Sequence, residues 1–479
     1  MDTAEPTYIG IHGYTIKKEC LEQGGLKLIK NDLNVRPYIP SSPIQSPSFP
    51  VYTETEHNIH VPRFYGIEHY GLPDVINVPR GTDIKLKFEG SLRDYQTDIV
   101  KEYIKNTSTT HGGGGLLEIP CGEGKTVIAL KILSELNKKT LVIVHKTFLG
   151  NQWIERINQF LPGARIGKLQ GQINDIEDKD IVIGMLQSLS MKEYAEDEFK
   201  SFGLIIVDEC HHISSEVFSR SLTKIITFYT LGLSATMQRK DGLSKVFKMF
   251  LGDIVFSKQR DKTDTVLIKA IDYIANDSEF NKVIMDQRGN PAYSSMISKL
   301  CSFGPRSEFI ISVIITELKN DPLQQIIVLA HNRNVLEYIH DAIEHRKIAT
   351  VGYYLGGMKE ADLKSSELDK VIIATYAMAA EALDIKTLTT LLLVTPKTDV
   401  VQAVGRILRV KHARPMVVDI IDTHDLFKSQ WAKRKKYYKS NNYKIMHTNS
   451  RDYVLNKWNE IVDTPKKNKC LIDVSSIKI

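Results

Sequence analysis

The segment LLEIPCGEGKT, residues 116–126, constrains the fold of this chain more than any other stretch. Its apolar start (Leu116, Leu117, Ile119) predicts a buried strand, and apolar residues recur with helical spacing after Thr126. A turn with two glycines lies between strand and helix. Strand, glycine turn, Lys-Thr and helix in this order are typical of a phosphate-binding loop. The preceding HGGGG, residues 111–115, is expected to be a flexible run.

The chemistry of such a loop follows from its backbone. Glycines let consecutive N–H groups point at a phosphate, and the helix N-terminus adds a positive dipole end. Lys125 is expected to reach the β- and γ-phosphates of a nucleotide, and the Thr126 hydroxyl to hold Mg²⁺. The strict pattern has glycine where this chain has Ile119, so an ordinary turn with a surface lysine is the alternative. The loop itself is expected to comprise Pro120, Cys121, Gly122, Glu123 and Gly124.

Composition indicates a soluble globular protein of two or three domains, with 479 residues, 42% hydrophobic and 25% charged. No apolar run approaches the roughly 20 residues of a membrane span, and the polar start MDTAEPTYIG is no signal peptide. The five cysteines form no C-x-x-C pair, which argues against a disulfide framework and favours a reducing, intracellular compartment. The net charge of +6 is compatible with a polyanionic partner.

Apolar strand candidates alternate with helical patterns in both halves of the chain, as at residues 141–144, 204–207 and 325–330. This alternation predicts an α/β fold with two tandem parallel sheets, and ligands bound beyond the carboxyl ends of the strands. Residues 416–422 are expected to close the second sheet. The expected divisions are a proline-rich accessory module (1–85), a first sheet domain (86–260), a linker or bridging segment (261–305), a second sheet domain (306–425) and a basic tail (426–479).

A second strong signal is LIIVDECHH, residues 204–212, in which Asp208 and Glu209 directly follow an apolar strand. In phosphate-loop enzymes an acid at this place holds Mg²⁺, and its neighbour polarises the attacking water. A surface acidic pair is the alternative. Zinc binding by His211 and His212 is poorly supported, because no cysteine pair accompanies them.

The second half has no phosphate loop, but its helix VQAVGRILR carries two arginines three positions apart. The nucleotide is therefore expected in a cleft to which the second sheet contributes arginines. The tail segment KRKKYYK, residues 433–439, has two open interpretations: a solvated helix end, or phosphate contact with base stacking. Arg63, Phe64 and Tyr65 are expected to pack in a loop rather than touch nucleic acid.

The motifs PCGEGKT, DECH, SAT, ATYAMAAEALD and QAVGRILR occur in this order, and over residues 88–425 the chain resembles a superfamily 2 helicase or translocase. The segments IPCGEGKT, VDECHH and GLSATMQRKDGL most resemble the XPB-type helicases and their relatives in large DNA viruses, including the poxvirus transcript-release helicase type. The resemblance implies two RecA-like domains, with ATP and Mg²⁺ as cofactors.

The resemblance also implies roles in ATP hydrolysis. Arg93 and Gln96 match the adenine-reading motif, and Asp384 lies with Glu381 in the motif that links the nucleotide cleft to the bound strand. Coupling between ATP state and the nucleic-acid groove is implied for His211, Ser234, Ala235 and Thr236. Catalytic roles are implied for Lys125, Asp208, Glu209, Gln402, Arg406 and Arg409, and metal binding for Thr126 and Asp208.

Contacts to the sugar-phosphate backbone are implied for a further set of positions: His145, Lys146, Gln170, Gly171, Gln187, Ser188, His331, Arg333, Gly356, Gly357 and Thr375. The expected activity is ATP hydrolysis coupled to 3′–5′ stepping, with DNA favoured over RNA as the partner. The alternatives are a transcript-release factor that moves on duplex without unwinding it, an RNA helicase, and a binding module that does not hydrolyse ATP. A monomer is expected, off the membrane and beside the transcription machinery, in the nucleus or cytoplasm of a host cell, or in the virion if the chain is viral.

Overall fold

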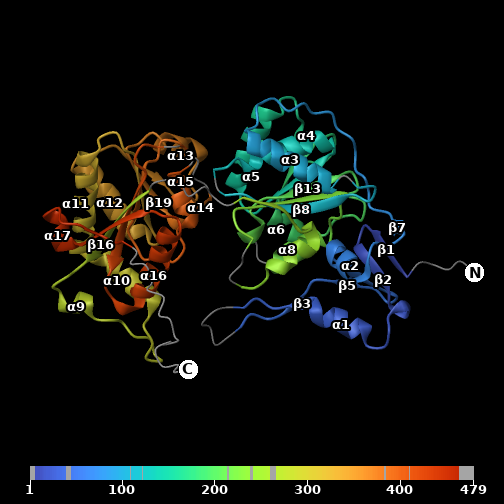
Figure 1. Cartoon of the computed structure of the whole chain (residues 1–479), viewed down its shortest axis with the longest axis horizontal. Coiled ribbons are helices and arrows are strands. Elements are labelled where there is room, and N and C mark those ends of the chain that lie inside the picture. The colour runs from blue at the N-terminus through green and yellow to red at the C-terminus, as the bar shows by residue number, and fades with distance from the viewer. Residues whose placement is uncertain are drawn as a thin grey trace, which may run out of the picture. The chain divides into compact units, whose positions relative to one another are not determined.

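The computed structural model describes residues 6–38, 45–107, 109–120, 122–212, 215–237, 241–258, 266–381, 385–408, 410 and 412–462. The chain divides into two compact units, Met1–Arg260 and Asp261–Ile479, coloured blue to green and yellow to red in Figure 1. Among the described residues, none of the helices is both long and apolar enough to cross a membrane.

The first unit is built on an eight-stranded sheet with the order β11-β10-β12-β9-β13-β14-β8-β15. Its strands are parallel, except that β11 runs antiparallel to β10. This confirms the parallel α/β sheet that the sequence predicts. The strands are β8 (Gly113–Glu118), β9 (Thr140–Val144), β10 (Ile166–Gln170), β11 (Ile173–Asn174), β12 (Ile181–Met185), β13 (Leu204–Val207), β14 (Tyr229–Ser234) and β15 (Ile254–Ser257).

Helices cover both faces of this sheet. Successive residues of a strand point to opposite faces, and here the residues on both faces are apolar and need to be buried. Val142 and Val144 of β9 belong to one apolar core, whereas Leu141 and Ile143 belong to the other. The first core is closed by α3 (Asp94–Thr107), α4 (Lys125–Leu136) and α5 (Thr147–Phe160), drawn above the sheet in Figure 1. The second core is closed by α6 (Leu186–Met191), α7 (Ser215–Leu222) and α8 (Ser244–Leu251).

The glycine run before the phosphate-loop strand is not a flexible segment, contrary to expectation. Gly113, Gly114 and Gly115 lie inside β8, between β14 and β15. A Cβ at Gly114 would stand 1.8 Å from the Thr230 hydroxyl oxygen, so a side chain has no room there. The glycines therefore allow close packing in the sheet.

The N-terminal residues form a second, smaller sheet with the order β5-β6-β2-β1-β7. Its strands are β1 (Thr7–Gly10), β2 (Gly13–Lys17), β5 (Thr53–Glu54), β6 (Asn58–Val61) and β7 (Val75–Ile76). It is accompanied by α1 (Gly25–Asp32), α2 (Arg63–Tyr70), the 3-10 turn η1 (Lys18–Cys20) and the pair β3 (Asn34–Val35) and β4 (Phe49–Pro50).

This N-terminal module is joined to the large sheet by a buried arginine. Arg63, only 3% exposed, donates to the carbonyls of Phe228 (3.1 Å), Thr227 (3.3 Å) and His111 (2.7 Å). Burial lowers its pKa to about 10, so it stays charged at neutral pH. Arg63 is packed as expected, although it lies in a helix rather than a loop.

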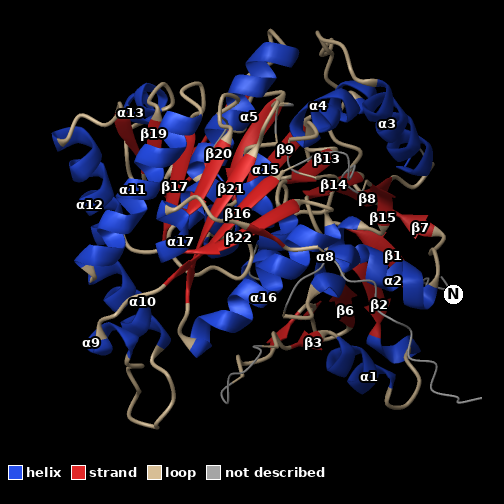
Figure 2. Ribbon diagram, turned by 60° about the vertical axis from the view of Figure 1, so that its left-hand side comes forward, coloured by secondary structure: helices blue, strands red, loops and turns tan. Residues whose placement is uncertain are grey.

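The second unit contains another eight-stranded sheet, with the order β18-β19-β17-β20-β21-β16-β22-β23. Figure 2 shows β19, β17, β20, β21, β16 and β22 side by side. The strands are β16 (Leu267–Tyr273), β17 (Ile326–Ala330), β18 (Val351–Tyr354), β19 (Val371–Thr375), β20 (Thr390–Leu393), β21 (Met416–Asp422), β22 (Lys444–Asn449) and β23 (Asn459–Glu460). The helices are α9 (Ser278–Asn281), α10 (Tyr293–Ser302), α11 (Gly304–Asn320), α12 (Arg333–His345), α13 (Glu360–Ser366), α14 (Tyr376–Glu381), α15 (Val401–Arg406), α16 (Asp425–Ser440) and α17 (Ser450–Val454).

The boundaries of the second unit differ from the sequence expectation at both ends. The expected linker 261–305 supplies β16, which pairs with β21 on one side and with β22 on the other. Consequently β21 lies inside the sheet and does not close it. The weak apolar pattern of β16 has a physical reason: Lys269 is accommodated by an ion pair with Glu317 (2.7 Å).

The expected basic tail is also part of the fold. It supplies α16 and β22, and Arg434 of α16 forms a two-pronged ion pair with buried Asp419 of β21 (2.8 and 2.9 Å). The fully buried Tyr438 donates its hydroxyl to the same carboxylate. Both tail interpretations are therefore wrong for Arg434 and Tyr438, whereas Lys433 and Lys436 are exposed.

Candidate active site

The phosphate-binding loop lies between β8 and α4, whose first residue is Lys125. Gly122 and Gly124 have φ angles of +85° and +82°, which favour glycine. A Cβ at Gly124 would also stand 2.5 Å from Nε2 of Gln96. Two left-handed glycines directly before a helix N-terminus are compatible with a loop that wraps an anion. Of the predicted loop residues, Cys121 lies outside the described part of the chain, and Pro120 is half-buried just ahead of it.

Of the two predicted adenine-reading residues, Gln96 contacts this loop directly, and Arg93 contacts Gln96. Gln96 Nε2 and the Tyr95 hydroxyl both donate to the Glu123 carbonyl, each at 3.0 Å. The backbone N–H of Arg93 donates to Gln96 Oε1, which fixes the orientation of the Gln96 amide. A residue that the sequence did not single out completes the group: the Lys258 ammonium pairs with the Glu123 carboxylate (3.1 Å) and lies 3.6 Å from the centre of the Tyr95 ring.

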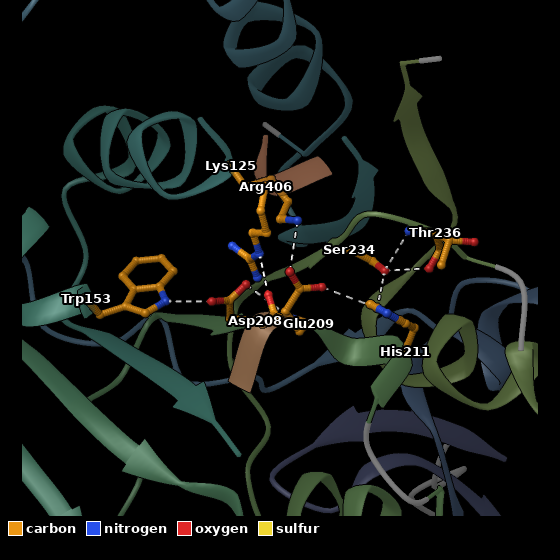
Figure 3. A network of polar contacts seen from close by, with 9 residues as sticks. Lys125, Trp153, Asp208, Glu209, His211, Ser234, Thr236 and Arg406 are labelled. Carbon is orange, nitrogen blue, oxygen red and sulfur yellow. Dashed lines mark hydrogen bonds and ion pairs between the residues drawn. The ribbon is translucent and has the colours of Figure 1, made fainter. Parts of the chain in front are cut away.

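The acidic pair after β13 faces the loop lysine, as Figure 3 shows. Lys125 Nζ lies 2.9 Å from Glu209 Oε1, and both side chains are largely buried. Glu209 has a φ of +48°, a conformation that is rare for a residue with a side chain. The two carboxylates separate at this turn: Glu209 reaches Lys125, whereas the Asp208 side chain is buried and contacts Trp153 of α5.

Asp208 is 6% exposed, and both of its carboxylate oxygens are engaged. Oδ1 accepts from the backbone N–H of Glu209 (2.9 Å), and Oδ2 accepts from the indole N–H of Trp153 (2.8 Å). Burial, with the nearby charge of Glu209, raises the pKa of Asp208 to about 6, against the opposing effects of Lys125 and Trp153. Trp153 of α5 was not among the predicted site residues.

Residues predicted to couple the two activities form a chain of contacts from Glu209. His211 Nδ1 lies 3.4 Å from Glu209 Oε2 and 2.7 Å from the Ser234 hydroxyl. The same hydroxyl accepts from the backbone N–H of Thr236 (3.2 Å), and Ala235 lies between them at the end of β14. Three polar contacts therefore connect Glu209 to the segment after β14, as Figure 3 shows.

Predicted nucleic-acid contacts of the first unit gather at the carboxyl ends of β9, β10 and β12. Gln187 Nε2 donates to the His145 carbonyl (3.1 Å), and the backbone N–H of Gly171 donates to the Ser188 hydroxyl (2.9 Å). Gln170 reaches Thr147, the first residue of α5, which is preceded by Lys146 at the N-cap. The structure thus brings His145, Lys146, Gln170, Gly171, Gln187 and Ser188 to one edge of the sheet, here called the polar edge.

The second unit has a comparable group at the ends of β17, β18 and β19. Arg333 donates to the Gly356 carbonyl (3.1 Å), and Gly357 follows with a φ of +90°. His331 bonds the Thr395 hydroxyl through its backbone N–H and ring Nδ1 (3.0 and 2.9 Å). Thr375, at the end of β19, is half-buried.

The predicted arginine helix of the second unit is α15. Arg406, also labelled in Figure 3, is 6% exposed, and its Nε donates to the Ala379 carbonyl (2.8 Å). Gln402 lies one turn earlier on the same helix. Arg409 and Asp384 lie outside the described residues, as do the side-chain surroundings of Glu381.

The residues predicted to hold a metal ion, Asp208 and Thr126, offer oxygen donors, a carboxylate and a hydroxyl. Mg²⁺ prefers oxygen ligands and is usually held by one or two carboxylates together with phosphate oxygens and water. The donor set therefore fits Mg²⁺ bound together with a nucleotide.

Comparison with known proteins gives consistent matches. The family model "Type III restriction enzyme, res subunit" matches residues 89–239. The putative ATP-dependent RNA helicase of Acanthamoeba polyphaga mimivirus is 33% identical over 98% of this chain and 92% of its own length. A putative helicase of Invertebrate iridescent virus 6 is 27% identical over 76% of this chain and 85% of its own. The DNA 3'-5' translocase XPB2 of Sulfurisphaera tokodaii is 37% identical over 36% of this chain and 37% of its own.

Proposed function

Because the chain belongs to the family of ATP-dependent helicases with two RecA-like domains, we propose that it is an Mg²⁺-dependent motor that steps along DNA. Membership makes it an ATP hydrolase that acts on nucleic acid. The proposal adds four points: DNA as the track, Mg²⁺ as the metal ion, 3′–5′ as the direction of movement, and the roles of the individual residues. The observation that carries it is the 2.9 Å contact between Lys125, at the phosphate loop, and Glu209.

This contact suggests how hydrolysis begins. A triphosphate in the loop would draw the Lys125 ammonium to its β- and γ-phosphates and release the Glu209 carboxylate. Glu209 would then orient the attacking water and accept its proton. Bound Mg²⁺, held by Asp208 and Thr126, would supply positive charge next to the phosphates. The remaining charge would be neutralised by the arginines that the resemblance assigns, Arg406 and Arg409, since phosphoryl transfer depends mainly on positioning and electrostatics.

Nucleic acid would bind along the polar edge of the first unit and the matching group of the second. These groups offer amides, hydroxyls and backbone N–H groups, which suit phosphate and sugar oxygens rather than base edges. Binding is therefore expected to depend little on sequence and strongly on salt concentration.

DNA is proposed as the track because the XPB-type resemblance implies it and a DNA 3'-5' translocase is 37% identical over 36% of this chain, whereas the mimivirus relative named as an RNA helicase is 33% identical over 98% of it. An RNA helicase is the second candidate, supported by that second name. We expect 3′–5′ movement by a monomer in the nucleus or cytoplasm, in association with transcription machinery. A transcript-release factor that moves on duplex without separating strands is the alternative form of the same motor.

The test of the track is the steady-state ATPase rate with no polymer, single-stranded DNA, duplex DNA or RNA, at matched nucleotide concentration. The proposal predicts that DNA stimulates the rate most. Stimulation by RNA alone would move the assignment to an RNA helicase, and no stimulation by any polymer would contradict a nucleic-acid motor.

A forked duplex separates the two forms of motor. Strand separation with ATP would identify a helicase. ATP hydrolysis that displaces a protein block from the duplex while the strands stay paired would identify a translocase.

A further inference from the structure

Trp153 makes a polar contact that neither the motifs nor the family comparison assigns. Its side chain is 2% exposed, and its indole N–H donates to Asp208 Oδ2 at 2.8 Å, as Figure 3 shows. A buried indole N–H needs an acceptor, and here the acceptor is the Asp208 carboxylate, which is predicted to hold Mg²⁺. The two residues are 55 positions apart in the sequence.

This contact fixes the orientation of the carboxylate. The Glu209 backbone N–H holds Oδ1, and the indole holds Oδ2, so the Asp208 carboxylate is anchored at both oxygens. Each oxygen keeps a further lone pair for another partner. The indole donor is also neutral, so it positions the carboxylate without competing with a cation for its charge.

Trp153 itself is held rigidly. Its ring belongs to the apolar core between the sheet and helices α3, α4 and α5, together with Ile157 one turn later. Helix α5 begins at Thr147, whose hydroxyl accepts from Gln170 of the polar edge (3.1 Å). Six residues of helix, about 9 Å, separate Thr147 from Trp153. One rigid helix, α5, therefore connects the polar edge to Asp208, the residue predicted to hold Mg²⁺.

We propose that Trp153 is a positioning residue that orients Asp208 for Mg²⁺ in the nucleotide site, and that α5 makes this orientation sensitive to nucleic acid on the polar edge. The inference rests on the proposed function, because it presupposes that Asp208 holds the metal ion. Partners of this kind behind a metal ligand typically change metal affinity by about 10- to 100-fold when they are removed.

The first test uses Trp153 as its own probe. Trp431 and Trp458 are the other tryptophans of the chain, and both lie in the second unit. In a Trp431→Phe/Trp458→Phe variant, emission comes from Trp153 alone. We expect a non-hydrolysable ATP analogue to change this emission only when Mg²⁺ is present, and Asp208→Asn to abolish the change. An emission that stays constant while the Mg²⁺–analogue complex binds, as measured by equilibrium dialysis, would overturn the inference.

The second test removes the indole N–H. Trp153→Phe is expected to raise the Mg²⁺ concentration for half-maximal binding of the analogue about 10- to 100-fold. Ile157→Val is the matched control, since it loosens the same core on the same helix without touching Asp208; it should lower the melting temperature and leave the Mg²⁺ requirement unchanged. Equal Mg²⁺ requirements in Trp153→Phe and the wild type would overturn the inference. If Trp153→Phe does not fold, the emission measurement decides.

Nucleic acid provides the last comparison. Adding the stimulating polymer should lower the Mg²⁺ requirement of the wild type and have little effect on that of Trp153→Phe. An equal effect on both proteins would remove α5 from the proposal. A wild type that binds no nucleotide under any condition would instead refute the proposed function itself.

Discussion

At the scale of single residues, the site depends on one backbone turn. Asp208 and Glu209 are neighbours in sequence, yet the φ of +48° at Glu209 sends their carboxylates to different partners. A left-handed conformation costs roughly 1–2 kcal/mol for a residue with a side chain. The ion pair with Lys125 offsets part of this cost, so strain is kept where the chemistry is expected.

A glycine substitution tests the shape of the phosphate loop. In Gly124→Ala the new Cβ would meet Gln96, in addition to the left-handed strain. We expect nucleotide affinity to fall about tenfold or more, as 1.4 kcal/mol or more of misfit implies. Isothermal titration with ATP would measure it.

Gly163→Ala is the matched control for that variant. Gly163 has a similar φ of +89°, but a Cβ there would meet nothing within 4 Å. Both variants should lose about 1–2 kcal/mol of folding stability from backbone strain. Equal ATP affinity in the two would show that the loop does not enclose the nucleotide.

The sequence was informative about residues within motifs and silent about their distant partners. Lys125, Asp208 and Glu209 could be placed in one site because a strand end and a loop fix each of them locally. Trp153 and Lys258 could not, because their partners lie 55 and 135 positions away and only the folded sheet brings them together. The one available signal was a tryptophan that follows the strand candidate 141–144, since a buried indole N–H requires an acceptor.

At the scale of elements, buried charges hold the less predictable parts of the chain in place. Arg63 joins the N-terminal module to the first sheet, and Arg434 joins α16 to the second. Continuous apolar strands such as β9, β13 and β17 were predictable because burial on both faces demands such runs. Strand β16 and helix α16 were not, because their lysines and arginines are satisfied by partners elsewhere in the sequence.

The role of Arg63 can be tested with Arg63→Met, which keeps an apolar side chain and removes the donors. Three carbonyls would lose their partner, and at roughly 1 kcal/mol each the free energy of unfolding should fall by about 3 kcal/mol. Exposed Arg36 provides the control, since Arg36→Met should stay within about 0.5 kcal/mol of the wild type. Chemical denaturation followed by circular dichroism would measure the difference. If Arg63→Met were as stable as the wild type, Arg63 would not be what attaches the N-terminal module to the first sheet.

The ion pair of α16 gives a second element-scale prediction. Arg434→Met leaves the fully buried Asp419 carboxylate without its counter-charge, which should cost about 3–5 kcal/mol. The double variant Arg434→Met/Asp419→Leu should recover most of this loss, apart from the roughly 1 kcal/mol hydrogen bond of Tyr438. Denaturation curves of both variants would give their free energies of unfolding. If the Arg434→Met curve matched that of the wild type, the ion pair would not be what holds α16 in the fold.

In the molecule as a whole, the two sheets carry different sets of predicted functional residues. The first unit carries the phosphate loop, the acidic pair and the polar edge; the second carries the arginine helix and the group at the ends of β17, β18 and β19 that is predicted to contact nucleic acid. The family resemblance implies a reason for this difference: one ATP site would control nucleic-acid binding by both units. The central claim is therefore that hydrolysis depends on Glu209 acting at a site that still binds ATP and nucleic acid.

The most direct measurement is the ATPase rate of wild type and Glu209→Gln on the polymer that stimulates most, with ATP and polymer binding measured on the same samples. We expect the variant to bind both ligands and to hydrolyse ATP about 10²- to 10⁴-fold more slowly, the range typical for loss of a general base. A variant that hydrolyses ATP at the wild-type rate would show that Glu209 is not the general base and would place the base elsewhere.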